Sequence, residues 1–173
     1  AVKKYPLHGT TNSDAAVTDL AKVVPVLEMM EQIGMPLCIH GETVTLNGEP
    51  LNHLKREALY VRGELQEILG RFPKLRVSLE HISTMEAAAF IRQHGNKDLV
   101  ATVTPHHLVT HIGRTMYTTD GAYMPCAKDI EDMYAVLDLI AGGCPWIHLG
   151  TDSAPHDETR KSAVQCACGA FNH

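Results

Sequence analysis

The sequence predicts an α/β fold built on a parallel sheet, and three observations carry this prediction. Helix-like and strand-like segments alternate along the whole chain, as they do in right-handed βαβ units. The strand-like segments are short and apolar, which is typical of strands buried on both faces. With 173 residues, 45% of them apolar, the chain has the length and composition of one domain with a full core. We therefore expect a single domain over residues 1–173.

Four segments show the apolar periodicity of a helix that packs on one face. The first has its stripe at 20–30, with Ser13 and Asp14 as start candidates, a local break at Pro25 and a stop at Gly34. The predicted helices after it cover 54–68, 83–95 and 130–140. In the third, Ser83 stands three residues before Glu86, which is the spacing of a capping box. Each helix is followed by an apolar run.

These apolar runs, at 35–40, 75–81, 99–104 and 146–152, are too short for helices and are predicted as strands. A very short strand is expected around Lys3 as well. The stretch 106–128 shows no clear period. Residues 55–57 and 157–161 mix both signs of charge, so we expect them to be solvated faces.

Composition excludes several classes of partner. The formal net charge is -5, so the chain lacks the basic surface that binds nucleic acid or anionic membranes. No apolar run approaches the ~18 residues that span a bilayer, and the first residues carry no signal-peptide pattern. An odd count of five Cys does not suggest a secreted disulfide framework. We expect a cytoplasmic protein whose chemistry depends on its 11 His.

Three predicted strands end in an ionisable residue: His40, His81 and Asp152. The carboxyl ends of parallel strands meet at one edge of a sheet, where α/β proteins build their sites. A single buried histidine is more often hydrogen-bonded to backbone than bound to a metal. Three such residues on one edge favour a site instead, because two neutral imidazoles and a carboxylate suit a divalent transition metal.

For two further pairs of residues, the sequence does not decide which side chains face the site. Lys3 stands at the end of the first short strand, but Lys4 is beside it, and strand neighbours point to opposite faces. His106 and His107 follow a predicted strand and so could contact a ligand, although paired histidines at the start of a loop commonly lie on the surface.

Several motifs together resemble the single-function bacterial and plant type of dihydroorotase, a family of the amidohydrolase superfamily. They are AVKKYP, TTNSDAAVTD, PVLEMMEQIGMPLCIHGE, LEHIST, ATVTPHHL and LGTDSAPH, and they extend over essentially the whole chain. IHGE, EHIST and LGTDSAPH favour this family over hydantoinases and allantoinases. The resemblance implies a (β/α)8 TIM barrel with two zinc ions and the interconversion of N-carbamoyl-L-aspartate and L-dihydroorotate in pyrimidine synthesis.

The resemblance also implies roles for the metal-site residues. Lys3 matches the lysine that carbon dioxide converts to a carbamate bridging the metals, and His40 and His81 match two histidine ligands. Asp152 matches an aspartate that binds one zinc ion and transfers the proton. This set has a chemical reason independent of the name, because two divalent ions sharing a hydroxide supply both a nucleophile and a polarised carbonyl, while a carboxylate moves the proton.

Substrate contacts are implied by the same comparison. Thr10 and Thr11 match a mobile loop that closes over the substrate. Met124 matches a backbone contact to the pyrimidine ring, and His156 matches a residue that holds the substrate carboxylate. A further backbone contact falls near Ala167 or Cys168, where the register stays open. The partner is therefore a small molecule, and whether the protein forms a homodimer is left open.

The chain also departs from the family pattern. It contains no His-x-His pair, which in the family ends the first strand, and it matches only strands four to eight, or about five βα units. A complete barrel needs at least about 200 residues. We favour a partial sequence of an ordinary enzyme, which would be inactive alone. The alternatives are a truncated, non-catalytic relative that serves as an interaction subunit, or another cyclic amidohydrolase.

Overall fold

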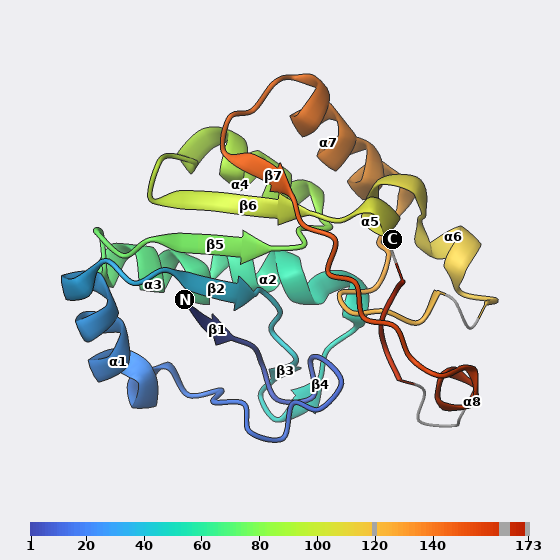
Figure 1. The fold of residues 1–173 in the computed structure, drawn as a ribbon, viewed down its shortest axis with the longest axis horizontal. Helices are drawn as coiled ribbons and strands as arrows, with labels where there is room; N and C mark the ends of the chain where they lie inside the picture. Colours follow the sequence, from blue (N-terminus) through green and yellow to red (C-terminus); the bar gives the residue numbers. More distant parts are fainter. Residues whose placement is uncertain (119–120, 163–166, 172–173) are drawn as a thin grey trace.

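A five-stranded parallel sheet forms the centre of the computed structural model, which describes residues 1–118, 121–162 and 167–171 (Figure 1). Its strands lie in the order β1-β2-β5-β6-β7, and every neighbouring pair is parallel. Their bounds are Val2–Lys4, Leu37–His40, Val77–Glu80, Leu99–Val103 and Ile147–Leu149. The predicted parallel α/β sheet is confirmed.

Helices connect the successive strands and pack on the sheet (Figure 1). The longer ones are α1 (Leu20–Ile33), α2 (Arg56–Arg62), α3 (Glu64–Arg71), α4 (Met85–His94) and α7 (Ile130–Ala141). Shorter elements are the hairpin of β3 (Thr45–Leu46) and β4 (Glu49–Pro50), η1 (His53–Lys55), α5 (Pro105–Val109), α6 (Ile112–Thr115) and α8 (Glu158–Lys161). Within the described ranges, no helix combines the length and apolarity needed to cross a membrane.

The two faces of the sheet differ in burial. Side chains of one face, such as Leu37, Ile39 and Leu79, are buried in one continuous apolar core with the helices. On the other face, Cys38 and Ser78 pair in register and are only half-buried. The expectation of strands buried on both faces is therefore wrong for Cys38 and Ser78, although His40 and Thr102 on the same face are buried. This face and the carboxyl ends of the strands are where the polar residues gather.

Helix starts differ from the predicted ones because several residues near each start can cap. Helix α1 begins at Leu20, where the Asp19 carboxylate accepts the Ala21 N–H at 3.0 Å, and not near Ser13. Its end at Gly34 is confirmed, with φ at 67° in the left-handed region. Pro25 lies inside this helix and does not end it.

The other predicted helices are also refined by the structure. Thr84 caps α4, since its hydroxyl accepts the Ala87 N–H at 3.2 Å, whereas Ser83 does not. The helix predicted over 54–68 is divided at Gly63 into α2 and α3, and α3 continues through Gly70 to Arg71. The stretch without a clear period contains α5 and α6 in its described part.

Candidate active site

His40 and His81 lie side by side at the carboxyl edge of the sheet. His40 is the last residue of β2, and His81 follows β5 directly, on the neighbouring strand. Both side chains are buried, at 3% exposure each, and their ring centroids are 4.6 Å apart with an interplanar angle of 70°. The structure thus brings these two predicted ligands together.

Tight backbone turns place the side chains at the ends of the strands. His81 and Asp152 have φ angles of 44° and 45°, in the left-handed region that costs a non-glycine residue about 1–3 kcal/mol. The His81 N–H donates to Thr102 Oγ1 at 2.6 Å, which holds its turn against β6. Gly41 follows His40 where a Cβ would lie only 2.7 Å from Leu79 Cδ1. A strained conformation at two such positions is typical of functional sites.

A buried ion pair lies behind His40. His40 Nε2 is 2.9 Å from Glu42 Oε2, and Glu42 Oε1 is 3.6 Å from Lys128 Nζ. Burial alone would raise the pKa of Glu42, but the His40 hydrogen bond and the Lys128 and Arg56 cations outweigh it, so this pKa lies below its ordinary value. Glu42 is therefore a carboxylate, which can only accept, and His40 donates from Nε2.

His81 is a neutral imidazole. Burial lowers its pKa well below the ordinary value, and the neighbouring His40, Lys3 and His107 side chains lower it further. Its Nδ1 is buried and has no hydrogen-bond partner among the described residues. Buried polar atoms normally have partners, so this nitrogen fits a site that receives a ligand.

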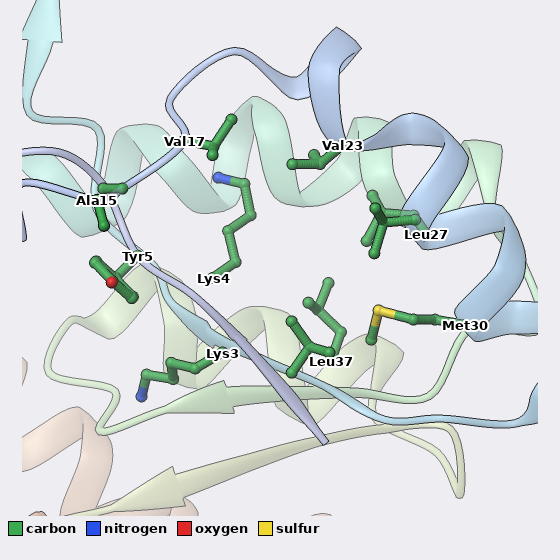
Figure 2. A pocket seen from close by; sticks show the side chains of 12 residues that line it. Lys3, Lys4, Tyr5, Ala15, Val17, Val23, Leu27, Met30 and Leu37 are labelled. Carbon is green, nitrogen blue, oxygen red and sulfur yellow. The ribbon is translucent and has the colours of Figure 1, made fainter.

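Lys3 and Lys4 point to opposite sides of β1, as Figure 2 shows. Lys3 pairs in register with Cys38, two residues before His40, so Lys3 and His40 face the same side of the sheet. Lys3 Nζ lies 3.7 Å from Glu80 Oε2, and its side chain is 40% exposed. Lys4 instead forms an ion pair with α3 on the helix side. Lys3 is therefore the residue that the site can use.

Asp152 lies on the same rim but is exposed. Displacement of water by the surrounding atoms raises its pKa above the ordinary value, and Glu80 raises it further, while Lys3 and His40 lower it. These influences show that Asp152 is close enough to feel the charged groups at the ends of β1, β2 and β5. A raised pKa suits a carboxyl group that takes up and returns a proton.

The donor set fits a transition metal only in part. Two adjacent imidazoles, one with an unpartnered nitrogen, are good ligands for zinc. Over residues 1–118, 121–162 and 167–171, however, no three His, Cys, Asp or Glu side chains are gathered closely enough to hold an ion. Lys3 and Asp152 share the rim with the histidines without completing such a group.

The predicted substrate residues converge at a second place. Thr10, Thr11, Met124 and Cys168 line one cavity of about 400 Å³. The Thr11 hydroxyl accepts the Cys168 N–H at 3.0 Å and donates to the Cys168 carbonyl at 3.3 Å. His156 Nε2 lies 3.2 Å from the same carbonyl. Two residues far apart in sequence are thus both tied to the C-terminal segment.

The expectation of a solvated face over 157–161 is confirmed for residues 157–160, which are exposed, whereas Lys161 is half-buried. Arg160 is exposed, but it lines the cavity that contains Thr11. Lys161 Nζ donates to the Gly169 carbonyl at 2.7 Å and the Ala122 carbonyl at 3.4 Å. Lys161 therefore joins two segments of the rim, which its position in a mixed-charge run did not indicate.

Residues 55–57 were expected on a solvated face, and this is wrong for Arg56 and Glu57, which are buried at 5% and 2% exposure. The Glu57 carboxylate accepts the Ser83 N–H at 3.0 Å and the Ser83 hydroxyl, which anchors the turn after His81. Burial raises the pKa of Glu57 to about 7, although Lys128 and the Ser83 hydrogen bonds lower it. No local sequence signal separates such buried charges from solvated ones.

His106 and His107 are also buried, so a surface position for them is wrong. His107 Nδ1 lies 2.5 Å from Thr104 Oγ1, and His107 Nε2 lies 2.9 Å from the Pro125 carbonyl. Because a carbonyl only accepts, Nε2 carries the hydrogen and Nδ1 accepts from the threonine hydroxyl. His107 therefore holds the segment that follows Met124 rather than offering a nitrogen to a ligand.

Similar solved structures define the class of fold. L-hydantoinase from Arthrobacter aurescens superposes with a TM-score of 0.77 over 98% of this chain and 42% of that one, at 16% identity. At this identity the likeness concerns the fold alone. The sheet with its helices thus has the fold of part of a TIM barrel. No protein-family model matches the chain.

Sequence similarity then points to one kind of amidohydrolase. A dihydroorotase from Pectobacterium carotovorum subsp. carotovorum is 40% identical over 178 residues, which cover 99% of this chain and 49% of that protein. Dihydroorotase from Saccharomyces cerevisiae, solved with 5-fluoroorotic acid, gives a TM-score of 0.88 at 30% identity, over 98% of this chain and 50% of that one. The chain spans about half the length of these relatives and, along nearly all of its own length, is homologous to dihydroorotases.

Proposed function

We propose that the chain is part of a zinc-dependent dihydroorotase, which interconverts N-carbamoyl-L-aspartate and L-dihydroorotate in de novo pyrimidine (UMP) biosynthesis in the cytoplasm. The observation that carries this proposal is the buried pair of His40 and His81 at adjacent strand ends, in a chain 40% identical to a dihydroorotase. The binding partner is a small molecule.

The proposed metal site uses residues of both histidine strands and of the outer strands. His40 and His81 would hold one of two zinc ions, Asp152 would hold the other, and a carbamate formed from Lys3 and carbon dioxide would hold both. When bound, such ions polarise an amide carbonyl and activate water. The unpartnered Nδ1 of His81 and the shared orientation of Lys3 and His40 support this assignment.

Asp152 is the proposed proton carrier. The ring amide opens when water adds to its carbonyl carbon and the ring nitrogen leaves with a proton. Asp152 takes up the proton that the attacking water loses and returns it to this nitrogen, so the atoms balance over the step. The direction of its pKa shift, upward by displacement of water, supports a carboxyl group that holds a proton for part of the cycle.

The substrate would lie against the cavity lined by Thr10, Thr11, Met124 and Cys168. Thr10 and Thr11 close over it, His156 donates to its carboxylate, and Met124 and Cys168 contact the ring through their backbone. The convergence of four of these residues on one cavity and the bond from His156 to Cys168 support this arrangement.

The experiment measures zinc content and dihydroorotate hydrolysis for the 173-residue chain, alone and co-expressed with the part of the Pectobacterium dihydroorotase that this chain does not match. We expect weak zinc binding and no turnover alone, and turnover in the co-expressed form. There, Asp152→Asn lowers turnover about 10²–10⁴-fold, because an amide cannot take up the proton, while zinc is retained.

Near-normal turnover of Asp152→Asn would remove Asp152 from proton transfer. Zinc binding that is unchanged in His40→Gln would contradict the proposed metal site. Absence of both zinc and turnover in the co-expressed form would favour the non-catalytic alternative.

A further inference from the structure

We infer that His107 is a positioning residue: its imidazole joins the end of β6 to the Pro125 carbonyl and thereby fixes the backbone of Met124 at the edge of the cavity. The inference rests on the proposed function, because it takes Met124 as a contact to the substrate ring. It goes beyond that function by giving a role to a buried histidine that is assigned neither to the metal nor to the substrate.

The two ring nitrogens of His107 have different partners. Nδ1 lies 2.5 Å from Thr104 Oγ1, and Nε2 lies 2.9 Å from the Pro125 carbonyl. Burial lowers the pKa of His107 well below its ordinary value, and the His106 side chain lowers it further, so the imidazole is neutral. A neutral imidazole has one donor and one acceptor nitrogen, which match a carbonyl on one side and a hydroxyl on the other.

Thr104 is a fixed support for this histidine. It directly follows β6, is fully buried and stands at the start of α5. Among the described residues its hydroxyl caps no backbone N–H of this helix, and the hydroxyl instead donates to His107 Nδ1. The position of the imidazole is therefore set by the sheet, so the Pro125 carbonyl is held from the end of a strand.

A second contact holds the residue that precedes Met124. The Thr110 hydroxyl donates to the His106 carbonyl at 2.5 Å, so the hydrogen between Thr110 Oγ1 and Tyr123 Oη, which are 2.6 Å apart, comes from the tyrosine. The Tyr123 ring also packs against the His106 ring, with centroids 4.4 Å apart. Tyr123 and Pro125 are buried, whereas Met124 between them is half-buried and lines the cavity.

The C-terminal segment holds the same stretch of backbone. The Gly169 N–H donates to the Ala122 carbonyl at 2.9 Å, and Lys161 Nζ donates to the carbonyls of both residues. Contacts at positions 122, 123 and 125 thus fix the backbone on both sides of Met124. Supporting contacts of this kind keep a residue that touches a ligand in its productive position.

The test compares two amide variants of His107 in the co-expressed enzyme. The shorter Asn side chain can still accept from the Thr104 hydroxyl but does not reach the Pro125 carbonyl, whereas the Gln amide reaches the place of Nε2 and can donate there. We expect His107→Asn to raise KM for dihydroorotate about fivefold and to change kcat less than about twofold, because a ring contact serves substrate and transition state alike. His107→Gln should keep KM within about twofold of wild type.

A merely structural role of His107 predicts a different pattern. Loss of folded protein lowers the apparent kcat and leaves KM unchanged, since the molecules that remain folded bind normally. Tyr60→Phe is the matched control, because it removes the hydroxyl of a buried tyrosine that donates to Glu64, away from the cavity, and its KM should be unchanged. A wild-type KM in His107→Asn, or an equal rise in His107→Gln or Tyr60→Phe, would overturn the inference.

Hydrogen exchange of the 173-residue chain separates this inference from the proposed function, because it needs no turnover. The amides of residues 122–126 should exchange about fivefold faster in His107→Asn than in wild type, and His107→Gln should stay close to wild type. Unchanged exchange in His107→Asn would overturn the inference, whereas a co-expressed wild type without turnover would contradict the proposed function. If His107→Asn does not fold, Thr104→Val decides: it removes the hydroxyl that holds Nδ1, and unchanged exchange in it would overturn the inference.

Discussion

The central strands and the outer strands of the sheet hold their polar residues in different ways. His40 and His81, on β2 and β5, are buried at 3% exposure and backed by charges that are buried too. Lys3 on β1 is 40% exposed along its side chain, and Asp152 beyond β7 is also exposed. The protein itself therefore orients the two histidines, whereas the described residues leave Lys3 and Asp152 less constrained.

The reason lies in what covers each strand. Helix α2 holds the turns that follow β2 and β5, since its Arg56 carbonyl accepts the Thr43 N–H and its Glu57 anchors the turn after His81. Buried hydrogen bonds and ion pairs keep a single geometry because the alternative is an unpaired group without water. An exposed lysine or aspartate has water as a partner in every orientation, and its surface ion pair contributes little.

The largest effect is expected from removing the buried cation. Lys128→Met leaves the Glu42 carboxylate buried without its nearest ammonium, and breaking such a pair costs about 3–5 kcal/mol. Lys3→Met, the control on the outer strand, should cost less than about 1 kcal/mol, because its pair with Glu80 is exposed. Urea unfolding of both variants measures the difference. Equal losses would mean that burial does not distinguish the two regions.

The next effect is a pH dependence carried by Glu57. Its pKa is raised from 4.5 to about 7, so the folded state keeps a proton that the unfolded state loses above pH 4.5. Stability should therefore fall as pH rises from about 4.5 to 7 and stay reduced above it, by about 1–3 kcal/mol.

Glu57→Gln cannot titrate and should flatten this part of the profile. The measurement is the free energy of unfolding of wild type and variant at pH 5 and pH 8. A difference between the two proteins that does not change with pH would show that Glu57 is ionised throughout this range.

The smallest effect is expected on the exposed side of the site, at the Thr11 hydroxyl. Thr11→Val removes the acceptor of the Cys168 N–H and the donor to its carbonyl. The loss of about 1 kcal/mol should speed hydrogen exchange of the Cys168 amide by roughly fivefold, with little change at His81. An unchanged exchange rate at Cys168 would show that the Thr11 hydroxyl does not hold its loop against the segment of Cys168.

The order of elements could be predicted because it depends on local patterns. Short apolar runs separated by helical periods predict the parallel sheet, and such a sheet places His40 and His81 on one edge. The exact starts of helices could not be predicted, since Ser83 and Thr84 are both good caps. Only the packing of Ser83 against Glu57 leaves Thr84 as the residue that caps α4.

The sequence by itself determined the class of fold, the two histidines at the strand ends and, through its motifs, the relation to dihydroorotases. Only the tertiary structure decided that Lys3 rather than Lys4 faces the side of His40, and that Glu42, Glu57 and Lys128 lie buried around the histidines. The physical reason is the distance along the sequence between the residues that decide each feature. Periodicity and strand ends are read from neighbours in sequence, whereas the burial of a charge depends on partners such as residues 42 and 128, which meet only when the chain folds.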